Sequence, residues 1–294
     1  MSKVKVESSD LPGLYQSANQ ASLNGQKSFF LALSIYLILL IGAAFVSYIR
    51  PNDNIGAIGS ASLFLITLGI LIFIRVKKPD DIWYNGRAVA ESVKTITWRW
   101  MMRAEPYADC ENMEAISKSF INDLKSILEQ NRHLSYSLQS VEAVSDAISE
   151  KMKFIRGQSV SERLSVYVNQ RIEDQATWYW LKSKFNKRRA SQWFWVSVAL
   201  HSLAISLLLY KINDPLISLP IETLATAAGA ALTWLQAKKH NELNSAYALT
   251  AHEIVLIKGE STGVHSESDL SEYVTNSESA FSREHTQWIA RKND

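Results

Sequence analysis

Several features common in catalytic and metal-binding proteins are missing from this sequence. Its 294 residues include one cysteine, Cys110, so no internal disulfide can form and no cysteine and histidine spacing indicates zinc. Phosphate-loop, serine-hydrolase and zinc-protease motifs are absent, and the six histidines are scattered. The net charge of +2 provides no strongly basic face for nucleic acid. We therefore expect no enzymatic activity, no cofactor, no metal site and no nucleic-acid partner.

Charge is also scarce locally, in four long apolar runs that form two copies of one pattern. The runs span residues 29–49, 55–74, 193–210 and 216–236. Each pair is joined by a five-residue loop, 50–54 or 211–215, and is followed by two lysines. Matching loop residues and both lysine pairs are separated by a constant 161 positions. This constant offset indicates a duplicated two-helix hairpin.

The lengths of the runs match a lipid bilayer. About 20 apolar residues at ~1.5 Å each cross the ~30 Å hydrocarbon core, where a segment must bond its own backbone groups as a helix. The predicted fold class is therefore an all-α integral membrane protein, with two transmembrane hairpins (four transmembrane helices) and a cytoplasmic helical bundle. We predict two domains, 1–135 and 136–294, each with one hairpin and its cytoplasmic helices.

Positive charge beside the runs predicts their orientation. It concentrates at one end of each hairpin, in Lys27, Arg75, Lys77, Lys78, Lys184, Lys187, Arg188, Arg189, Lys238 and Lys239. Each tight loop holds a single cation, Arg50 or Lys211. Because short basic segments stay in the cytoplasm, we predict a multi-pass membrane protein with both termini cytoplasmic. Residues 1–27 are polar and the first run is full length, so we expect no cleaved signal peptide.

Two pairs of small residues lie inside the runs. Gly56 with Ser60, and Ala225 with Gly229, have the small-xxx-small spacing that lets helix backbones approach closely. We expect packing within a hairpin, with a dedicated oligomer interface as the alternative.

Two ionisable residues, His201 and Glu222, also lie inside the runs. Such groups are costly in lipid and usually face a bundle interior or water. Antiparallel pairing offsets the two by about four residues, ~6 Å along the axis, so both are candidate pore-lining residues with a role in conduction or gating. Alternatively, His201 packs as a neutral side chain and Glu222, just after Pro220, lies at the membrane interface.

The cytoplasmic part is predicted to form long helices. Residues 80–103 lack a breaker except Gly86, and the helix ends at Glu105-Pro106. Apolar residues at helical spacing predict a second, amphipathic helix over 113–128. A polar linker is expected over 131–139, with the helical pattern resuming over 140–154.

A polar and aromatic stripe precedes the third run. Its members recur every three or four positions, which places them on one face of a helix. They are Arg163, Tyr167, Arg171, Gln175, Trp178, Tyr179, Lys182 and Asn186. Trp98, Arg99, Trp100 and Arg103 form a second aromatic and basic cluster. Arginines and aromatic faces could stack on a nucleobase and bind a phosphate. They could equally pack helix on helix with the arginines paired to acids, or lie at the membrane interface.

Several strings in this chain resemble those of one protein family. Residues 83–94 (WYNGRAVAESVK), with Trp98-Arg99-Trp100 and Glu105-Pro106-Tyr107, resemble the motif after the first hairpin of SLATT proteins (SMODS- and SLOG-associating two-transmembrane effectors). Within it Trp83, Arg87, Glu91, Lys94, Trp98 and Arg99 form a candidate cytoplasmic motif, in which Arg87, Glu91 and Lys94 share a helix face. The stripe resembles the helix leading into the second hairpin of tandem members, and Glu284-His285 with Trp288 resembles their closing helix.

The resemblance implies a bacterial membrane effector of an anti-phage or nucleotide-signalling conflict system, one that perturbs or permeabilises the inner membrane when triggered. Membrane lipid, further copies of the chain, and an upstream nucleotidyltransferase or cyclic nucleotide signal are the expected partners. The resemblance supplies no catalytic residues. The alternatives are a non-conducting membrane scaffold and a constitutive ion channel.

Overall fold

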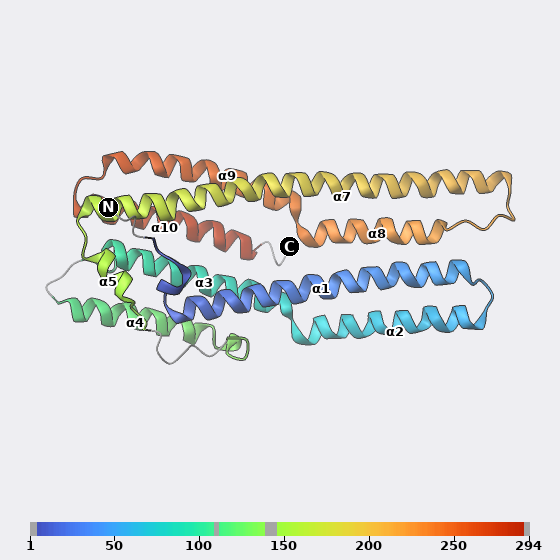
Figure 1. Ribbon diagram of the computed structural model, residues 1–294, viewed down its shortest axis with the longest axis horizontal. Coiled ribbons are helices and arrows are strands. Elements are labelled where there is room, and N and C mark those ends of the chain that lie inside the picture. Colours follow the sequence, from blue (N-terminus) through green and yellow to red (C-terminus); the bar gives the residue numbers. More distant parts are fainter. Residues whose placement is uncertain (1–4, 109–111, 139–145, 291–294) are drawn as a thin grey trace. The chain divides into compact units, whose positions relative to one another are not determined.

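The computed structural model describes residues 5–108, 112–138 and 146–290, the last eight of these by their backbone alone, and is helical throughout with short turns. The helices labelled in Figure 1, with α6 between α5 and α7, are α1 (Gly13–Ile49), α2 (Asn54–Lys77), α3 (Pro79–Met102), α4 (Met113–Gln130), α5 (Glu150–Arg156), α6 (Val160–Tyr167), α7 (Glu173–Asn213), α8 (Ile221–Lys238), α9 (His240–Glu260) and α10 (Glu267–Ala290). A π-helical turn, Val168–Ile172, joins α6 to α7. The short 3-10 turns are Ser8–Asp10, Arg132–Leu134 and Ser261–Gly263.

The helices form two compact units. The core unit comprises Met1–Gln26, Asp80–Leu181 and Ala246–Asp294. The hairpin unit comprises Lys27–Pro79 and Lys182–Ser245. Helices α1 and α7 begin in the core unit and end in the hairpin unit, so each belongs to both. Each unit draws on both sequence repeats, and the division into domains 1–135 and 136–294 stays a prediction.

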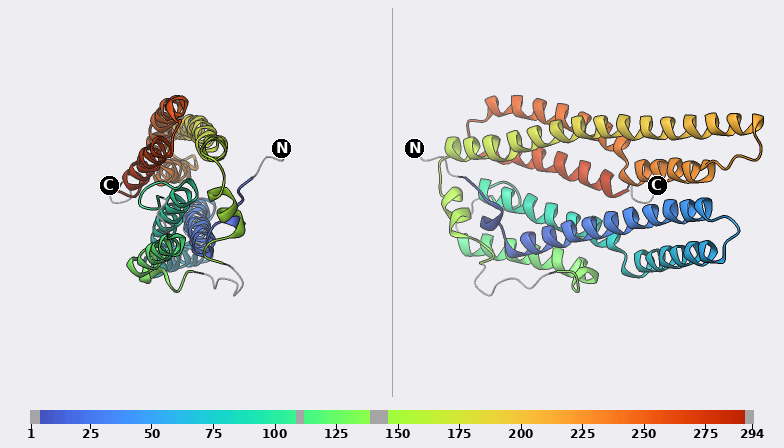
Figure 2. Two further views of the ribbon diagram at one scale, coloured as in Figure 1. Left: turned by 90° about the vertical axis from the view of Figure 1, so that its left-hand side faces the viewer. Right: turned by 45° about the vertical axis from the view of Figure 1, so that its right-hand side comes forward.

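The first hairpin has the predicted form. Helix α1 ends at Ile49 and α2 begins at Asn54, and Figures 1 and 2 show α2 beside the apolar half of α1. In the turn, Arg50 Nη1 lies 2.9 Å from Asp53 Oδ2, and the Asp53 carboxylate accepts the N–H of Ile55. The hydrogen bond from Arg50, with that from Ile55, holds the pKa of Asp53 below its ordinary value. Asp53 therefore caps α2 as an anion at the positive end of the helix.

The sequence repeat is also visible in the backbone. Lys78 follows α2 in the left-handed conformation, with φ 45°, and its N–H bonds Ile74 O. Lys239 follows α8 in the same way, with φ 47°, and bonds Gln236 O. A left-handed residue with this bond is a common helix stop. The second helix of each hairpin thus ends at the second lysine of a repeated lysine pair, Lys78 after α2 and Lys239 after α8.

The second hairpin corrects the prediction for the fourth run. Helix α8 begins at Ile221, not at Leu216, and the connection from α7 covers residues 214–220 rather than a five-residue loop. Pro215 and Pro220 explain the difference, since proline lacks an N–H and disfavours helix in the residue before it. Leu216 is consequently 96% exposed. Glu222, expected about six residues into the run, lies in the first turn of α8.

Three of the four predicted spans lie in helices long and apolar enough to cross a membrane. Over the described residues these helical stretches are Gly13–Ile49, Asn54–Met102 and Val160–Asn213. Helix α8 is not among them, because it begins after the apolar residues 216–219 and contains several polar ones. The described part of the chain is thus helical, with three helices suited to span a membrane, and the fourth transmembrane helix stays a prediction.

The small-residue pairs differ between the hairpins. Gly56 and Ser60 are buried, and Ser60 Oγ lies 3.1 Å from Ala43 O and 3.0 Å from Ser47 Oγ of α1. This confirms packing within the first hairpin. Gly229 is exposed, with open space where a Cβ would lie.

The hydrophobic core of the core unit surrounds the end of α3. Trp100, Met102 and Phe120 are fully buried there. Nearer the start of α3, Gly86 permits close contact with α1, because a Cβ at this position would lie 3.0 Å from Ala18 O. Ser22 Oγ donates to Trp83 O at 2.9 Å beside it. The one glycine in the predicted 80–103 helix therefore serves helix packing.

The segment expected to be a linker is irregular where it is described. Residues 131–138 contain only the Arg132–Leu134 turn, although Leu134 is buried. The helical pattern predicted for 140–154 falls partly outside the described residues, and within them α5 begins at Glu150.

Candidate functional site

The predicted stripe runs through α6, the π-helical turn and the start of α7. Arg163, Tyr167 and Arg171 are fully buried and Tyr179 nearly so. Gln175 and Trp178 are half-buried, Asn186 is buried, and Lys182 is exposed. The π-helical turn has more residues per turn than an α-helix, so it keeps Arg171 aligned with Tyr167, four positions earlier. The spacing argument therefore identified one buried face from Arg163 to Tyr179, which the exposed Lys182 interrupts before Asn186.

Side chains in the buried part of this stripe donate hydrogen bonds to the carboxylate of Glu278 on α10. Arg171 donates from Nε at 2.8 Å and from Nη2 at 2.7 Å to the two oxygens of Glu278. Tyr167 donates its hydroxyl at 3.0 Å, and Thr95 of α3 donates at 2.8 Å. Arg171 and Glu278 are 1% and 0% exposed. Four hydrogen bonds from two other parts of the chain thus converge on one buried anion.

The ring of Phe281 completes the surroundings of Arg171. The guanidinium carbon lies 4.8 Å from the centre of this ring. Burial alone would lower the pKa of Arg171, but Glu278 outweighs burial and raises it. Burial, reinforced by Glu278, raises the pKa of Tyr167 well above its ordinary value. Both groups therefore keep their protons, and the cluster is a fixed ion pair with a neutral tyrosine.

Sequence reasoning missed Glu278, although a signal for it exists. On α10 the buried residues Leu270, Val274 and Phe281 recur at helical spacing, and Glu278 falls on the same face. An acidic residue on an apolar face indicates a buried partner of opposite charge.

Other arginines bind the carboxyl end of α3. Arg163 Nη1 donates to Met102 O at 2.7 Å and its other terminal nitrogen pairs with Glu267. Arg156 donates to Trp100 O and its guanidinium lies 5.0 Å from the centre of the Trp100 ring. Carbonyls in the last turn of a helix lack intrahelical partners, and cations are favourable there. These arginines therefore fix where α3 ends.

The candidate cytoplasmic motif after the first hairpin lies along α3. Arg87 Nη2 and Glu91 Oε1 form the expected ion pair at 2.7 Å. The ring of Trp98 meets the Tyr167 ring edge-on at 5.7 Å, and Arg99 reaches Ser279 Oγ of α10 at 3.1 Å. Burial, then the nearby charge of Arg171, lowers the pKa of Lys94. The end of this motif and the stripe, treated separately in the sequence, thus meet against α10.

The candidate pore-lining residues are both exposed in the hairpin unit. His201 Nδ1 lies 2.8 Å from Ser197 O in its own helix. Glu222 lies near the amino end of α8, where a negative charge is favourable. Within the described part of the chain, no hydrogen bond or ion pair joins the two.

Some sequence predictions lie outside what the structure describes. Cys110 is not described, and Glu284, His285 and Trp288 are described only by the backbone of α10. Among the described residues, no group of three histidine, cysteine, aspartate or glutamate side chains could hold a metal ion.

Comparison with known families gives two matches that follow one another along the chain. Residues 12–164 match the family described as SMODS and SLOG-associating 2TM effector domain 3, and residues 167–288 match domain 1 of the same series. No curated protein and no solved structure matches the chain. The two matches meet at the end of α6, inside the stripe.

Proposed function

The chain belongs to the SLATT family of SMODS- and SLOG-associating two-transmembrane effectors, as a tandem of two such domains, and we propose that it permeabilises the bacterial inner membrane when an upstream signal reaches its core unit. The signal we propose is a cyclic nucleotide or the nucleotidyltransferase that makes it. The chain itself performs no chemistry in this proposal, and several copies assemble.

One observation carries the proposal: the helical stretch Val160–Asn213 runs from the buried stripe in α6, the π-helical turn and the start of α7 to an apolar run near the end of α7. Tyr179 packs in the core unit, where its ring lies 5.5 Å from that of Tyr247 on α9. Fourteen positions later, at Trp193, the apolar run begins in the hairpin unit. A change in the packing of the core unit against the start of α7 is therefore transmitted along the helix into the membrane.

A protein that permeabilises the membrane only when signalled needs two conformations, and the signal must change their relative populations. The Arg171 and Glu278 pair supports such an arrangement, because a buried ion pair is stable only while both partners are in place. A ligand that displaces α10 or rearranges the stripe would shift the equilibrium. Basic residues beside the hairpins support a cytoplasmic location for the core unit and both termini.

The test is the membrane potential of cells that express the chain, measured with a voltage-sensitive dye. Each of a panel of cyclic-nucleotide-forming nucleotidyltransferases is co-expressed or omitted. Loss of potential only with a nucleotidyltransferase supports a triggered effector. Loss without any of them would indicate a constitutive ion channel. An unchanged potential throughout would indicate a non-conducting scaffold.

The stripe is tested with two neighbouring aromatic residues of α7. Tyr179→Ala removes a buried ring, whereas Trp180→Ala removes one that is 55% exposed. If the stripe couples the core unit to the membrane, Tyr179→Ala abolishes growth arrest and Trp180→Ala does not, with both proteins inserted. If the loss of activity simply follows a loss of thermal stability, the stripe is a packing seam without a signalling role.

The pore is tested at His201 and Glu222 in liposomes that contain the triggered protein. Glu222→Gln keeps the shape and removes the charge, so it changes ion selectivity without changing insertion if this residue faces water. His201→Leu is expected to narrow the leak. Identical leakage from the wild type and both variants would place the path elsewhere, along the first hairpin or between copies.

A further inference from the structure

A segment of α7 is rich in positive charge. From Gln175 to Asn213 the sequence has no aspartate or glutamate, yet positions 182, 184, 187, 188 and 189 are lysine or arginine. Within the described residues, no ion pair joins Lys187, Arg188 or Arg189 to a carboxylate. An anion from outside the chain would be attracted to this segment.

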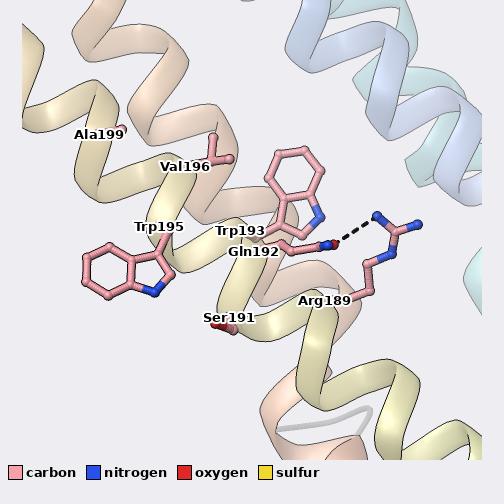
Figure 3. Close-up of a pocket in the computed structure, with 7 residues that line it drawn as sticks. All are labelled: Arg189, Ser191, Gln192, Trp193, Trp195, Val196 and Ala199. Atoms are coloured by element: carbon pink, nitrogen blue, oxygen red, sulfur yellow. Dashed lines mark hydrogen bonds between the residues drawn. The ribbon is translucent and has the colours of Figure 1, made fainter.

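Next to these cations, α7 has an open hollow of about 660 Å³, drawn in Figure 3. It is lined by Arg189, Ser191, Gln192, Trp193, Trp195, Val196 and Ala199. Figure 3 shows Trp195 at one edge of this lining and Arg189 with Trp193 at the other. The polar side chains lie at one end of the hollow, and the apolar ones continue toward the other.

The guanidinium at the polar end is already oriented. Arg189 Nη1 donates to Gln192 Oε1 at 3.2 Å, and its guanidinium carbon lies 5.4 Å from the centre of the Phe185 ring. At the apolar end, Trp195 is 63% exposed, and its ring meets the Phe194 ring edge-on at 5.5 Å. The hollow therefore combines a positioned cation with a largely exposed apolar surface.

The depth of these residues matches one leaflet of a bilayer. The apolar run begins at Trp193, so Arg189 lies ~6 Å before it and Ala199 ~9 Å beyond it along the helix. The first depth is that of lipid headgroups, and the second lies within the ~15 Å of hydrocarbon that one leaflet provides. Tryptophan is enriched at this boundary.

We infer that the hollow binds one anionic phospholipid, with its phosphate at Arg189 and Gln192 and an acyl chain along Trp195, Val196 and Ala199. Arginine offers two parallel donors to a phosphate oxygen pair, and a cluster of cations beside a membrane helix attracts anionic lipid. The inference goes beyond the proposed function, because it requires only that α7 enter a bilayer.

The test uses the full-length chain in detergent micelles, with bound lipid counted by native mass spectrometry. Phosphatidylglycerol is the probe, and phosphatidylcholine, which has no net charge, is the comparison. Arg189→Gln is expected to weaken phosphatidylglycerol binding about tenfold through loss of the charge-assisted bonds. Trp195→Ala is expected to weaken both lipids, because it removes acyl-chain contact. Arg188→Gln is the matched control, since it removes the same charge at a residue that does not line the hollow.

Three results would overturn the inference. Equal effects of Arg188→Gln and Arg189→Gln would mean that the segment acts only as a diffuse positive surface. Equal binding of phosphatidylglycerol and phosphatidylcholine by the wild type would mean that the charge has no role. Displacement of phosphatidylglycerol by inorganic phosphate alone would mean a site for free anions, without an acyl chain.

Discussion

Glu278→Gln tests whether the buried ion pair holds α10 on the core unit. The substitution keeps the shape of the side chain and removes its charge. Arg171, 1% exposed, then remains charged without its partner. Glu91 attracts Arg171 more weakly, but it is already paired with Arg87 at 2.7 Å. No other carboxylate among the described residues forms an ion pair with Arg171.

The expected cost follows from this geometry. Removing one partner of a buried pair costs about 3–5 kcal/mol, because the remaining charge is left in a medium of low polarity. In Glu278→Gln the amide oxygen still accepts a hydrogen bond at one of the two positions, but the NH2 group at the other position can only donate and faces donors of Arg171 and Thr95 or Tyr167. The lost acceptor adds to the cost of the unpaired charge, so the lower end of the range is not expected. Combining Glu278→Leu with Arg171→Met removes both charges, and we expect it to recover most of the loss.

The assay is amide hydrogen exchange of the full-length chain in detergent micelles, followed by mass spectrometry over peptides of α10. A loss of about 3–5 kcal/mol raises the local opening constant by roughly two to four powers of ten. Glu272→Gln is the control, because Glu272 is an exposed acid on the same helix and its loss should change stability by about 0.5 kcal/mol at most. Exchange in Glu278→Gln that matches the control would refute the view that the pair holds α10.

Two further predictions concern the hairpins. Gly56→Ala should lower the thermal stability of the full-length chain, because the added Cβ would lie 2.6 Å from the Arg50 backbone. The control Gly229→Ala, whose Cβ would meet nothing within 4 Å, should be neutral or slightly stabilising. Equal melting temperatures of the two variants would contradict the close approach at Gly56. Cysteines introduced at Asn52 and Asn213 should react in intact cells with impermeant thiol reagents, while the native Cys110 should not, and labelling at only one of the two introduced sites would contradict the symmetric topology.

The sequence alone determined the local features of this protein. The apolar runs were sufficient to place the first hairpin, and the 161-residue offset marked the two lysine pairs at which the structure ends α2 and α8. Helical spacing also placed Arg163, Tyr167 and Arg171 on one face. These features are predictable because backbone bonding and side-chain periodicity act over a few neighbouring residues. The same arguments failed at the start of α8, where Pro220 outweighed the apolar residues before it.

Only the tertiary structure decided what the stripe contacts. Arg171 and Glu278 are 107 positions apart, and no periodicity within the stripe indicates which carboxylate will pair with Arg171. The choice between a buried ion pair and an exposed ligand contact depends on which helices come together and how much water they exclude. The path of the chain brings α10 onto α3 and the π-helical turn before α7. Arg171, for which the sequence allowed either interpretation, is therefore a buried structural charge.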